Sequence, residues 1–399
     1  MAFGHQRSES LRLLLREIAQ TGPIPRIDLS ERTGISRATV TTITADLLRG
    51  GLIEEITPPK DMDARRGRPK VNLKISGAAR LVAGIKVSDS TLSFVLMDFE
   101  GADLVALDCP LNPGRHKPEE LAEAIAEGLD SLALVANIAT KDISGVGVAL
   151  AGLIRADTGL VYWSPSLTQR NVNFVDVLTT RLKCPVFVDN DANLVAMAET
   201  EFGHGREHSD FIVVTIESGV GMGIVIGGQL YRGARGSGGE FGHTKVQLEG
   251  ALCRCEQRGC LEAYVADYAL QREAVSVGLV GAELTTQDAV TKVLTAAKDG
   301  DGLAKSVVDR AGRMFALGLA NLVNIFDPEL IILAGEQMQF DHLYAETVME
   351  QMRKSIVEID KPAPEVIVHK WGNAMWARGA AAFALDYIRD LAVDDLEDA

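Results

Sequence analysis

A meander of strand-forming residues joined by tight turns occurs twice in this 399-residue chain. The first copy begins at residue 81 and reads LVAGIKV, STLSFVLMDF and DLVALDCPL, with turns at 88–90 and 100–101. The second copy reads FIVVTI over 211–216 and MGIVIGGQL over 222–230. Because each meander is followed by alternating helices and strands, the pattern predicts two similar α/β lobes. Two facing lobes leave a cleft, which is the usual place for a small ligand.

Hydrophobic periodicity and turn residues predict the remaining elements of the body. They are a helix over 118–136, a strand over 145–154, a helix near 173–182, a strand over 185–191, a helix opening after Asn193 and a final helix over about 374–389. The final helix carries Trp376, Phe383, Leu385 and Ile388, and we expect it to pack back on the first lobe. The predicted domains are a head at 1–76, a first lobe at 77–196 joined by the helix at 373–390, and a second lobe at 197–372.

The head shows the element order of a helix-turn-helix. Leucine and isoleucine at helical spacing within 8–20 predict a first helix. A second helix begins at Pro25 and ends at Gly34, because glycine permits the tight turn there. Ser36 is placed to cap a third helix, which ends at Gly50-Gly51. Short helix, glycine turn and helix make up the layout of a DNA-binding motif.

Short polar side chains gather at the start of the third helix, where they suit entry into a major groove. We expect DNA contacts from Ser36, Arg37, Thr39, Thr41 and Thr42. Strands at 52–56 and 71–75 flank a basic loop and form a wing, from which Arg68 reaches phosphates or a minor groove. The alternative is a three-helix packing module with a solvated basic loop.

The charge distribution fits a head that binds a polyanion. The chain has a net charge of −15, yet residues 1–75 hold 13 Lys and Arg against 9 Asp and Glu, a net of +4. Residues 76–399 hold 27 against 46, a net of −19. This asymmetry is expected when only the head meets double-stranded DNA, although chance variation in a short segment also produces it.

Composition bears on the compartment. The sequence contains no uninterrupted run of about 18 apolar residues, so it predicts no membrane span. Its N-terminal residues include no apolar stretch that ends in a small-residue cleavage site, so no signal peptide is expected. Five cysteines are an odd number without disulfide-like spacing. We therefore expect a cytoplasmic protein.

Three of the five cysteines lie in the polar segment CRCEQRGC. Cys253, Cys255 and Cys260, together with His243, supply one nitrogen and three sulfurs. This is a complete tetrahedral set for zinc, with no open position for a catalytic water. The sequence therefore predicts a structural Zn²⁺ site. A disulfide leaves one cysteine unpaired, and the polar segment cannot bury three thiols as hydrophobic side chains.

The body resembles the ROK family of repressors, open reading frames and kinases over residues 80–390. The resemblance rests on Gly-Glu-Phe-Gly-His at 239–243, the cysteine cluster, Cys-Leu-Glu at 260–262 and Val-Asp-Asn-Asp-Ala-Asn at 188–193. It implies a two-lobed α/β fold of the actin/hexokinase (ribonuclease H-like) type. One departure is Glu256, which stands where the family usually has glycine.

The resemblance also implies which residues bind a sugar. They are Asn190, Asp191, Glu240, His243 and Glu262. A sugar presents hydroxyls that both donate and accept, so a selective site needs carboxylates, amides and imidazole at fixed positions. One nitrogen of His243 then holds zinc while the other faces a hydroxyl. Taken singly, the glutamates are also read as solvated loop residues and Asn190 as a helix cap.

The segments that hold ATP in the family's kinases are altered. Where an Asp-x-Gly-Gly-Thr motif is expected, this chain reads Lys86, Val87, Ser88, Asp89 and Ser90. The glycine-rich stretch at 217–223 begins with a glutamate, and Ala334-Gly335-Glu336 replaces a glycine run. A carboxylate repels phosphate, and side chains keep backbone N–H groups away from it. We therefore expect a binder that has lost catalysis.

The head and the body together predict a sugar-sensing transcriptional regulator, a repressor whose operator affinity changes when a sugar binds. A homodimer or dimer of dimers is expected, since two heads read a palindromic operator. The alternative is a ROK sugar kinase with an accessory DNA-binding head. A third class, a regulator sequestered by a protein partner such as a transporter component, stays open.

Overall fold

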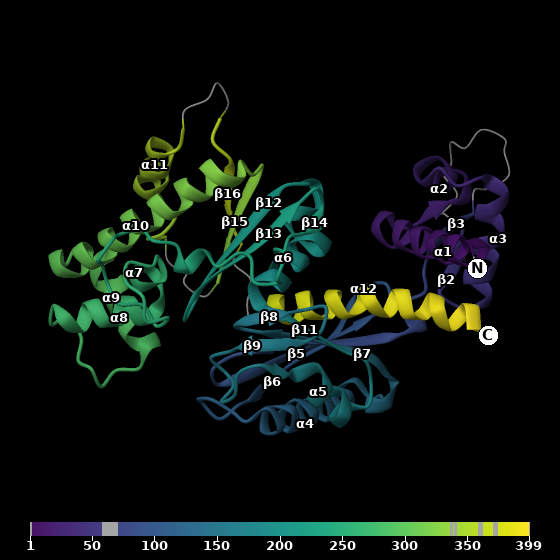
Figure 1. The fold of residues 1–399 in the computed structure, drawn as a ribbon, viewed down its shortest axis with the longest axis horizontal. Coiled ribbons are helices and arrows are strands. Elements are labelled where there is room, and N and C mark those ends of the chain that lie inside the picture. The colour runs from purple at the N-terminus through teal and green to yellow at the C-terminus, as the bar shows by residue number, and fades with distance from the viewer. Residues whose placement is uncertain are drawn as a thin grey trace. The chain divides into compact units, whose positions relative to one another are not determined.

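The computed structural model describes residues 2–57, 71–335, 338, 341–357, 362–369 and 374–398. Arg68 and Glu336, which the sequence analysis singled out, lie outside the described residues. The chain divides into two compact units, whose elements are drawn in Figure 1. The first unit comprises 1–152, 156–189 and 376–399, and the second comprises 153–155 and 190–375.

The head in the first unit is a three-helix, three-strand winged motif. Its elements are α1 (Ala2–Thr21), α2 (Arg26–Thr33), α3 (Arg37–Arg49), β1 (Ile24–Pro25), β2 (Ile53–Ile56) and β3 (Asn72–Ile75), with the strands in the order β1-β3-β2. Gly34 ends α2 with a φ of 71°, and the Ser36 hydroxyl accepts the Thr39 N–H at 3.2 Å. The predicted turn and cap are therefore both present.

Apolar side chains hold the three helices of the head together. Leu11, Leu14, Leu15 and Ile18 of α1 are at most 1% exposed, and Val40 and Leu47 of α3 are fully buried. Burying such side chains stabilises a small domain by about 1.5–3 kcal/mol each. The head therefore has its own core, as the helical spacing predicted.

The rest of the first unit is built on a five-stranded sheet. Its strands are β4 (Leu81–Val87), β5 (Thr91–Asp98), β6 (Asp103–Pro110), β7 (Ile143–Leu150) and β11 (Val186–Asn190), in the order β11-β7-β4-β5-β6. The neighbouring elements are α4 (Pro118–Ala136), α5 (Phe174–Leu182), β9 (Leu160–Trp163) and β10 (Val172–Asn173). The predicted first meander and the predicted helices over 118–136 and 173–182 are confirmed.

The single strand predicted over 145–154 is wrong. The chain forms β7 up to Leu150 and then a separate strand, β8 (Leu153–Arg155). Gly152 lies between them with a φ of 131°, and a Cβ there would come within 2.2 Å of the Trp163 carbonyl oxygen. Only glycine suits that backbone conformation and that close approach.

The C-terminal helix α12 (Ala374–Asp398) packs on the first unit's sheet and runs nine residues beyond the predicted end. Close packing requires glycine beneath it. A Cβ on Gly84 would lie 1.9 Å from the Ala377 carbonyl oxygen, and one on Gly147 would lie 1.8 Å from that of Ala380. The four large apolar residues named on the predicted helix are at most 3% exposed: Trp376, Phe383, Leu385 and Ile388.

The far end of α12 contacts the head through ion pairs. Arg16 of α1 lies 2.8 Å from Asp390 and 3.6 Å from Asp386, and Arg12 pairs with Asp394. Apolar contact accompanies these pairs, because a Cβ on Gly50 would meet the Leu396 side chain. One helix therefore links the sheet of the first unit to the DNA-binding motif.

The second unit contains the other five-stranded sheet. Its strands are β12 (Phe211–Ile216), β13 (Val220–Ile226), β14 (Gln229–Leu230), β15 (Leu330–Ala334) and β16 (Glu365–Val368), in the order β14-β13-β12-β15-β16. Its helices are α6 (Asp191–Phe202), α7 (Glu262–Val265), α8 (Asp267–Ser276), α9 (Thr286–Lys298), α10 (Gly302–Phe326) and α11 (Glu346–Ser355). Short 3₁₀ turns occur at Gly77–Ala79 and Thr140–Asp142 in the first unit and at His204–Glu207 and Phe241–His243 in the second.

Two predicted boundaries in this unit move. The segment 222–230 is two strands rather than one, because Gly227 and Gly228 both have a positive φ and turn the chain back. The helix expected after Asn193 begins at Asp191 instead, since the Asn190 side chain caps it. Within the described residues, no helix is long and apolar enough to cross a membrane.

Candidate functional site

Four potential metal ligands meet in the second unit. The ligand atoms of His243, Cys253, Cys255 and Cys260 all lie within 4.8 Å of one another. Cys255 Sγ is 3.7 Å from Cys260 Sγ, and Cys253 Sγ is 3.7 Å from His243 Nδ1. Sulfur and imidazole donors this close together can hold a metal ion.

The backbone of the cysteine segment explains why these ligands converge. Gly259 has a φ of 79°, and a Cβ there would lie 1.8 Å from the Gln247 carbonyl oxygen, so this position requires glycine. Glu256 also has a positive φ, of 69°. The glycine that the family usually places there therefore suits the conformation, and this chain keeps that conformation with a glutamate at some strain.

Asn190 and Asp191 lie where β11 ends and α6 begins. The Asn190 side-chain oxygen accepts the Ala192 N–H at 3.0 Å and the Asn193 N–H at 3.3 Å. Asp191 accepts the Ala192 N–H at 2.9 Å. Asn190 therefore caps the first turn of α6, which is the role the helix-cap interpretation predicted for it.

Three carboxylates and one imidazole gather beside the metal ligands. Glu240 Oε2 lies 3.9 Å from His243 Nε2, which is the ring nitrogen not facing Cys253. Desolvation raises the pKa of Glu240, and the charges of Asp191 and Glu262 raise it further while His243 opposes them. The Glu240 side chain nevertheless stays 45% exposed, so a ligand can reach it. The structure thus brings Asp191, Glu240, His243 and Glu262 into one neighbourhood.

Glu262 connects this carboxylate group to the cysteine cluster. It is 8% exposed, and its Oε1 lies 3.5 Å from Cys253 Sγ. Tyr268 donates to the same Oε1 at 3.2 Å, and Arg254 lies 4.1 Å from the centroid of the Tyr268 ring. The Tyr268 hydroxyl also lies 3.6 Å from Cys253 Sγ, so this one side chain contacts both Glu262 and the cluster.

Sequence reasoning did not single out two residues of this neighbourhood. Tyr268 lies 3.6 Å from Cys253 Sγ, and Lys245 donates to Cys260 Sγ at 2.8 Å. Burial raises the pKa of the Cys260 thiol to about 11, and the Lys245 ammonium opposes that rise by favouring the thiolate, which is the form that binds metal. The spacing of Lys245, two residues after His243, was the available clue.

Glu262 also lies against the glycine-rich stretch that the sequence analysis compared with a phosphate loop. The Val220 N–H donates to Glu262 Oε2 at 3.4 Å, and a Cβ on Gly219 would lie 3.2 Å from that oxygen. A largely buried carboxylate therefore lies against the backbone of this stretch.

Five of the six predicted DNA-binding residues lie within the described part of the head, at the start of α3. Ser36, Arg37, Thr39, Thr41 and Thr42 are all exposed. The Thr41 hydroxyl donates to the Arg37 carbonyl at 2.8 Å, and Arg37 lies 3.9 Å from Glu31 in an exposed ion pair. Exposed ion pairs are weak, so Arg37 can exchange this partner for DNA at little cost.

Comparison with known proteins places the chain in a family. Residues 83–387 match the ROK family, and residues 7–54 match the winged helix-turn-helix DNA-binding family. The xylose repressor of Bacillus subtilis is 27% identical over 95% of this chain and 96% of its own length. The DNA-binding transcriptional dual regulator NagC of Escherichia coli is 30% identical over 82% of this chain and 80% of its own length.

A solved structure has the same arrangement of elements. The ROK family transcriptional regulator described as a homologue of the E. coli Mlc protein superposes with a TM-score of 0.83 at 24% identity, over 99% of this chain and 100% of its own. At that identity the likeness establishes the actin/hexokinase-like fold with a winged head. The chain therefore belongs to the ROK family, whose body it carries behind a winged helix-turn-helix head.

Proposed function

We propose that this protein is a sugar-sensing transcriptional repressor of carbohydrate uptake or catabolism genes. The proposal rests on one observation, the presence of two features in the same chain. The start of α3 is exposed, as in a helix that enters a DNA groove, and carboxylate, amide and imidazole side chains lie beside the Cys₃His cluster. The relatives named as a xylose repressor and as NagC support it. Operator DNA is the partner of the head, and a sugar is the effector of the body.

The sugar is assigned to Asn190, Asp191, Glu240, His243 and Glu262. Carboxylates accept hydrogen bonds from hydroxyls, while the Asn190 amide and the His243 imidazole supply donors. Glu240 and His243 Nε2 are close enough for one sugar hydroxyl to donate to the carboxylate and accept from the imidazole N–H. Xylose, glucose, fructose and N-acetylhexosamines all offer hydroxyls of this kind, so the effector has to be identified by titration.

The metal is assigned as structural zinc. A tetrahedral ion with bonds of about 2.3 Å to sulfur places two sulfur ligands about 3.8 Å apart. Cys255 Sγ and Cys260 Sγ are 3.7 Å apart, and so are Cys253 Sγ and His243 Nδ1. Four protein ligands leave no open position, so the ion would supply rigidity rather than a reactive water. It would hold His243 and Glu262 in place for the sugar.

The signal is assigned to a change in the arrangement of the two lobes. A ligand shifts such an equilibrium only through different affinities for two arrangements. In a dimer, altered spacing of the heads would mismatch a palindromic operator. We assign α12 a part in this coupling, because it packs on the sheet at one end and pairs with the head at the other.

The test is an operator titration. DNA fragments selected on the immobilised protein provide the operator, and gel shifts with each candidate sugar report the change in affinity. We expect one sugar to change operator affinity by at least about tenfold, equivalent to a coupling of about 1.4 kcal/mol. If no common sugar changes it even severalfold, sensing of free sugar is wrong and a protein partner becomes the leading explanation.

The rival function is a sugar kinase with an accessory head. It requires a metal-binding aspartate where Lys86 stands and a phosphate cradle where Glu262 lies against Val220. A coupled assay with hexoses, ATP and Mg²⁺ separates the two functions. Turnover above background that Asp191→Asn abolishes would establish the kinase instead.

A further inference from the structure

A cavity lies in the second unit, away from the cysteine cluster in the sequence. It has a volume of about 720 Å³ and is lined by α9, α10 and the segment from Asp341 to Gln351. That volume falls in the range of small-molecule sites in proteins, about 300–1,000 Å³. None of the residues assigned to DNA, sugar or metal lines it.

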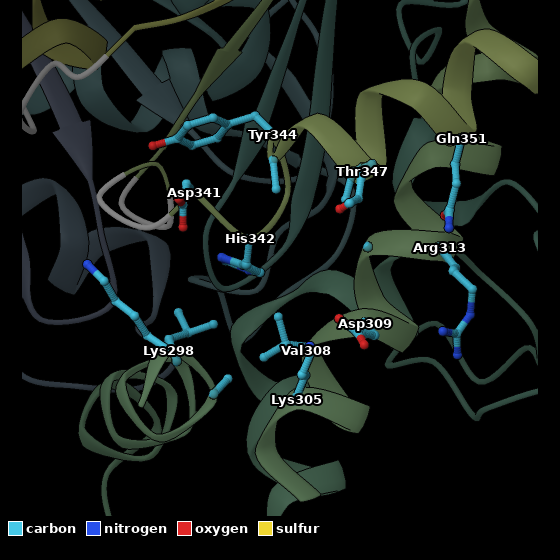
Figure 2. Close-up of a pocket in the computed structure, with 15 residues that line it drawn as sticks. Lys298, Lys305, Val308, Asp309, Arg313, Asp341, His342, Tyr344, Thr347 and Gln351 are labelled. Carbon is cyan, nitrogen blue, oxygen red and sulfur yellow. The ribbon is translucent and has the colours of Figure 1, made fainter. Parts of the chain in front are cut away.

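His342 makes this cavity more than a surface hollow. It is 9% exposed, and neither of its ring nitrogens has a hydrogen-bond partner among the described residues. Figure 2 shows its ring at the centre of the lining, between Lys298 on one side and Asp309 on the other. A buried polar group without a partner destabilises a fold, so a side chain like this marks a place where something else completes the hydrogen bonds.

The chemistry of His342 restricts the occupant. Burial lowers the pKa of His342 to about 4, so the ring is neutral at physiological pH. A neutral imidazole has one N–H donor and one acceptor nitrogen. A hydroxyl group satisfies both kinds of partner, whereas an apolar ligand satisfies neither.

The charges around the cavity add a second requirement. Lys298, Lys305 and Arg313 line it together with Asp309 and Asp341, a net of one positive charge. Among the described residues, no ion pair or hydrogen bond engages the charged ends of the three cations. Unpaired cations on a concave surface favour an anion.

We propose that this cavity binds a small hydroxylated anion, such as a sugar phosphate or a sugar acid, at a site separate from the sugar group beside the cysteines. The hydroxyls pair with His342, and the anionic group pairs with Lys298 and Lys305. The protein would then read two metabolites, a neutral sugar at one site and an acidic one at the other.

The experiment uses the full-length protein and three probes: glucose 6-phosphate, gluconate and glucose. Calorimetric titration and thermal unfolding report binding, because a ligand that binds the folded state raises its stability. We expect at least one anion to bind at one site per chain and to raise the midpoint temperature of thermal unfolding by a few degrees. The comparison of the two anions tells a phosphate from a carboxylate.

Variants assign that binding to the cavity. We expect Lys298→Gln with Lys305→Gln to weaken the anion at least about tenfold, and His342→Leu to remove its binding. Lys292→Gln, an exposed residue of α9 that does not line the cavity, is the matched control and should change nothing. Asp191→Asn should leave anion binding intact, which separates this site from the sugar group.

Two results would overturn the proposal. One is the absence of binding by both anions up to about 10 mM, far weaker than typical metabolite sites. The other is anion binding that survives in both cavity variants. Before the result for His342→Leu is used, circular dichroism and an unchanged affinity for the operator should show that this variant is folded.

Discussion

The Lys86 ammonium lies 3.8 Å from the centroid of the Trp376 ring, and both side chains are at most 3% exposed. This contact joins β4 to the start of α12 at the position where the resemblance to the family's kinases implies a metal-binding aspartate. A cation over a buried indole is an attractive pair, worth about 2 kcal/mol or more when desolvated. The position thus serves packing in this protein.

Restoring the aspartate should not restore a kinase. We expect Lys86→Asp to stay at background in an ATP-coupled assay, because Glu262 still lies against the Gly219–Val220 backbone. The same substitution removes the contact with Trp376 and should lower the free energy of unfolding by about 2 kcal/mol or more. Trp376→Ala, measured alongside by urea unfolding, should cost about 3–5 kcal/mol. Detectable phosphorylation by Lys86→Asp would show that the site is only one residue away from catalysis.

Metal removal should abolish sugar sensing while leaving the head folded. We expect about one equivalent of zinc per chain by elemental analysis, none in Cys255→Ser, and no sugar response in that variant. The reason is that His243 loses the ion that fixes it beside Glu240. Tyr268, which contacts both Cys253 and Glu262, likewise loses a fixed sulfur on one side. Cys184→Ser is the control, since Cys184 is not part of the cluster. A metal-free variant with a normal sugar response would contradict the assignment.

Removing one charged side chain from α3 tests whether this helix reads the DNA sequence. Arg37→Ala should weaken binding to the selected operator by about 1–3 kcal/mol and weaken binding to scrambled DNA less. Fluorescence anisotropy at fixed salt measures both affinities. Arg181→Ala, an exposed arginine paired with Glu123 outside the head, controls for net charge. Equal losses on the two DNAs would mean that Arg37 contacts phosphates only.

The ion pairs between α1 and α12 should carry part of the coupling. Arg16→Asp places like charges opposite Asp386 and Asp390 and should reduce the sugar effect on operator affinity, although each exposed pair contributes only about 0–1 kcal/mol to stability. Adding Asp390→Arg reverses the pair and should restore the effect. Gel shifts with and without sugar give the readout. Failure of the reversed pair to restore it would mean that Arg16 acts elsewhere.

Acid should weaken the protein through His342. Its folded pKa of about 4 lies below the ordinary value of 6.5, so the unfolded chain binds the proton first as the pH falls. Its contribution to stability is therefore complete above pH 6.5 and is lost between pH 6.5 and 4, with a slope of up to about 1.4 kcal/mol per pH unit. Urea unfolding across this pH window should show that the unfolding free energy changes less steeply with pH in His342→Leu than in the unaltered protein. Identical slopes would mean that other groups cause the acid sensitivity.

Local rules in the sequence determined much of this protein. Helical spacing, the glycine at 34 and the cap at Ser36 were sufficient for the head, because each acts within a few residues. Ligand chemistry and spacing predicted the cluster of His243 with three cysteines, because soft donors so close in sequence have few other uses. The two meanders could also be predicted from the sequence, because strand alternation and tight turns are local signals.

Tertiary structure decided what depends on residues distant in sequence. Gly152 breaks a predicted strand because the Trp163 carbonyl comes too close for a side chain. Tyr268 holds Glu262, and α12 extends far enough for Asp390 to meet Arg16, some 374 positions earlier in the chain. The His342 cavity has no sequence signature at all. Burial and close approach are set by the packing of the whole fold, and no window of sequence contains both partners of such a contact.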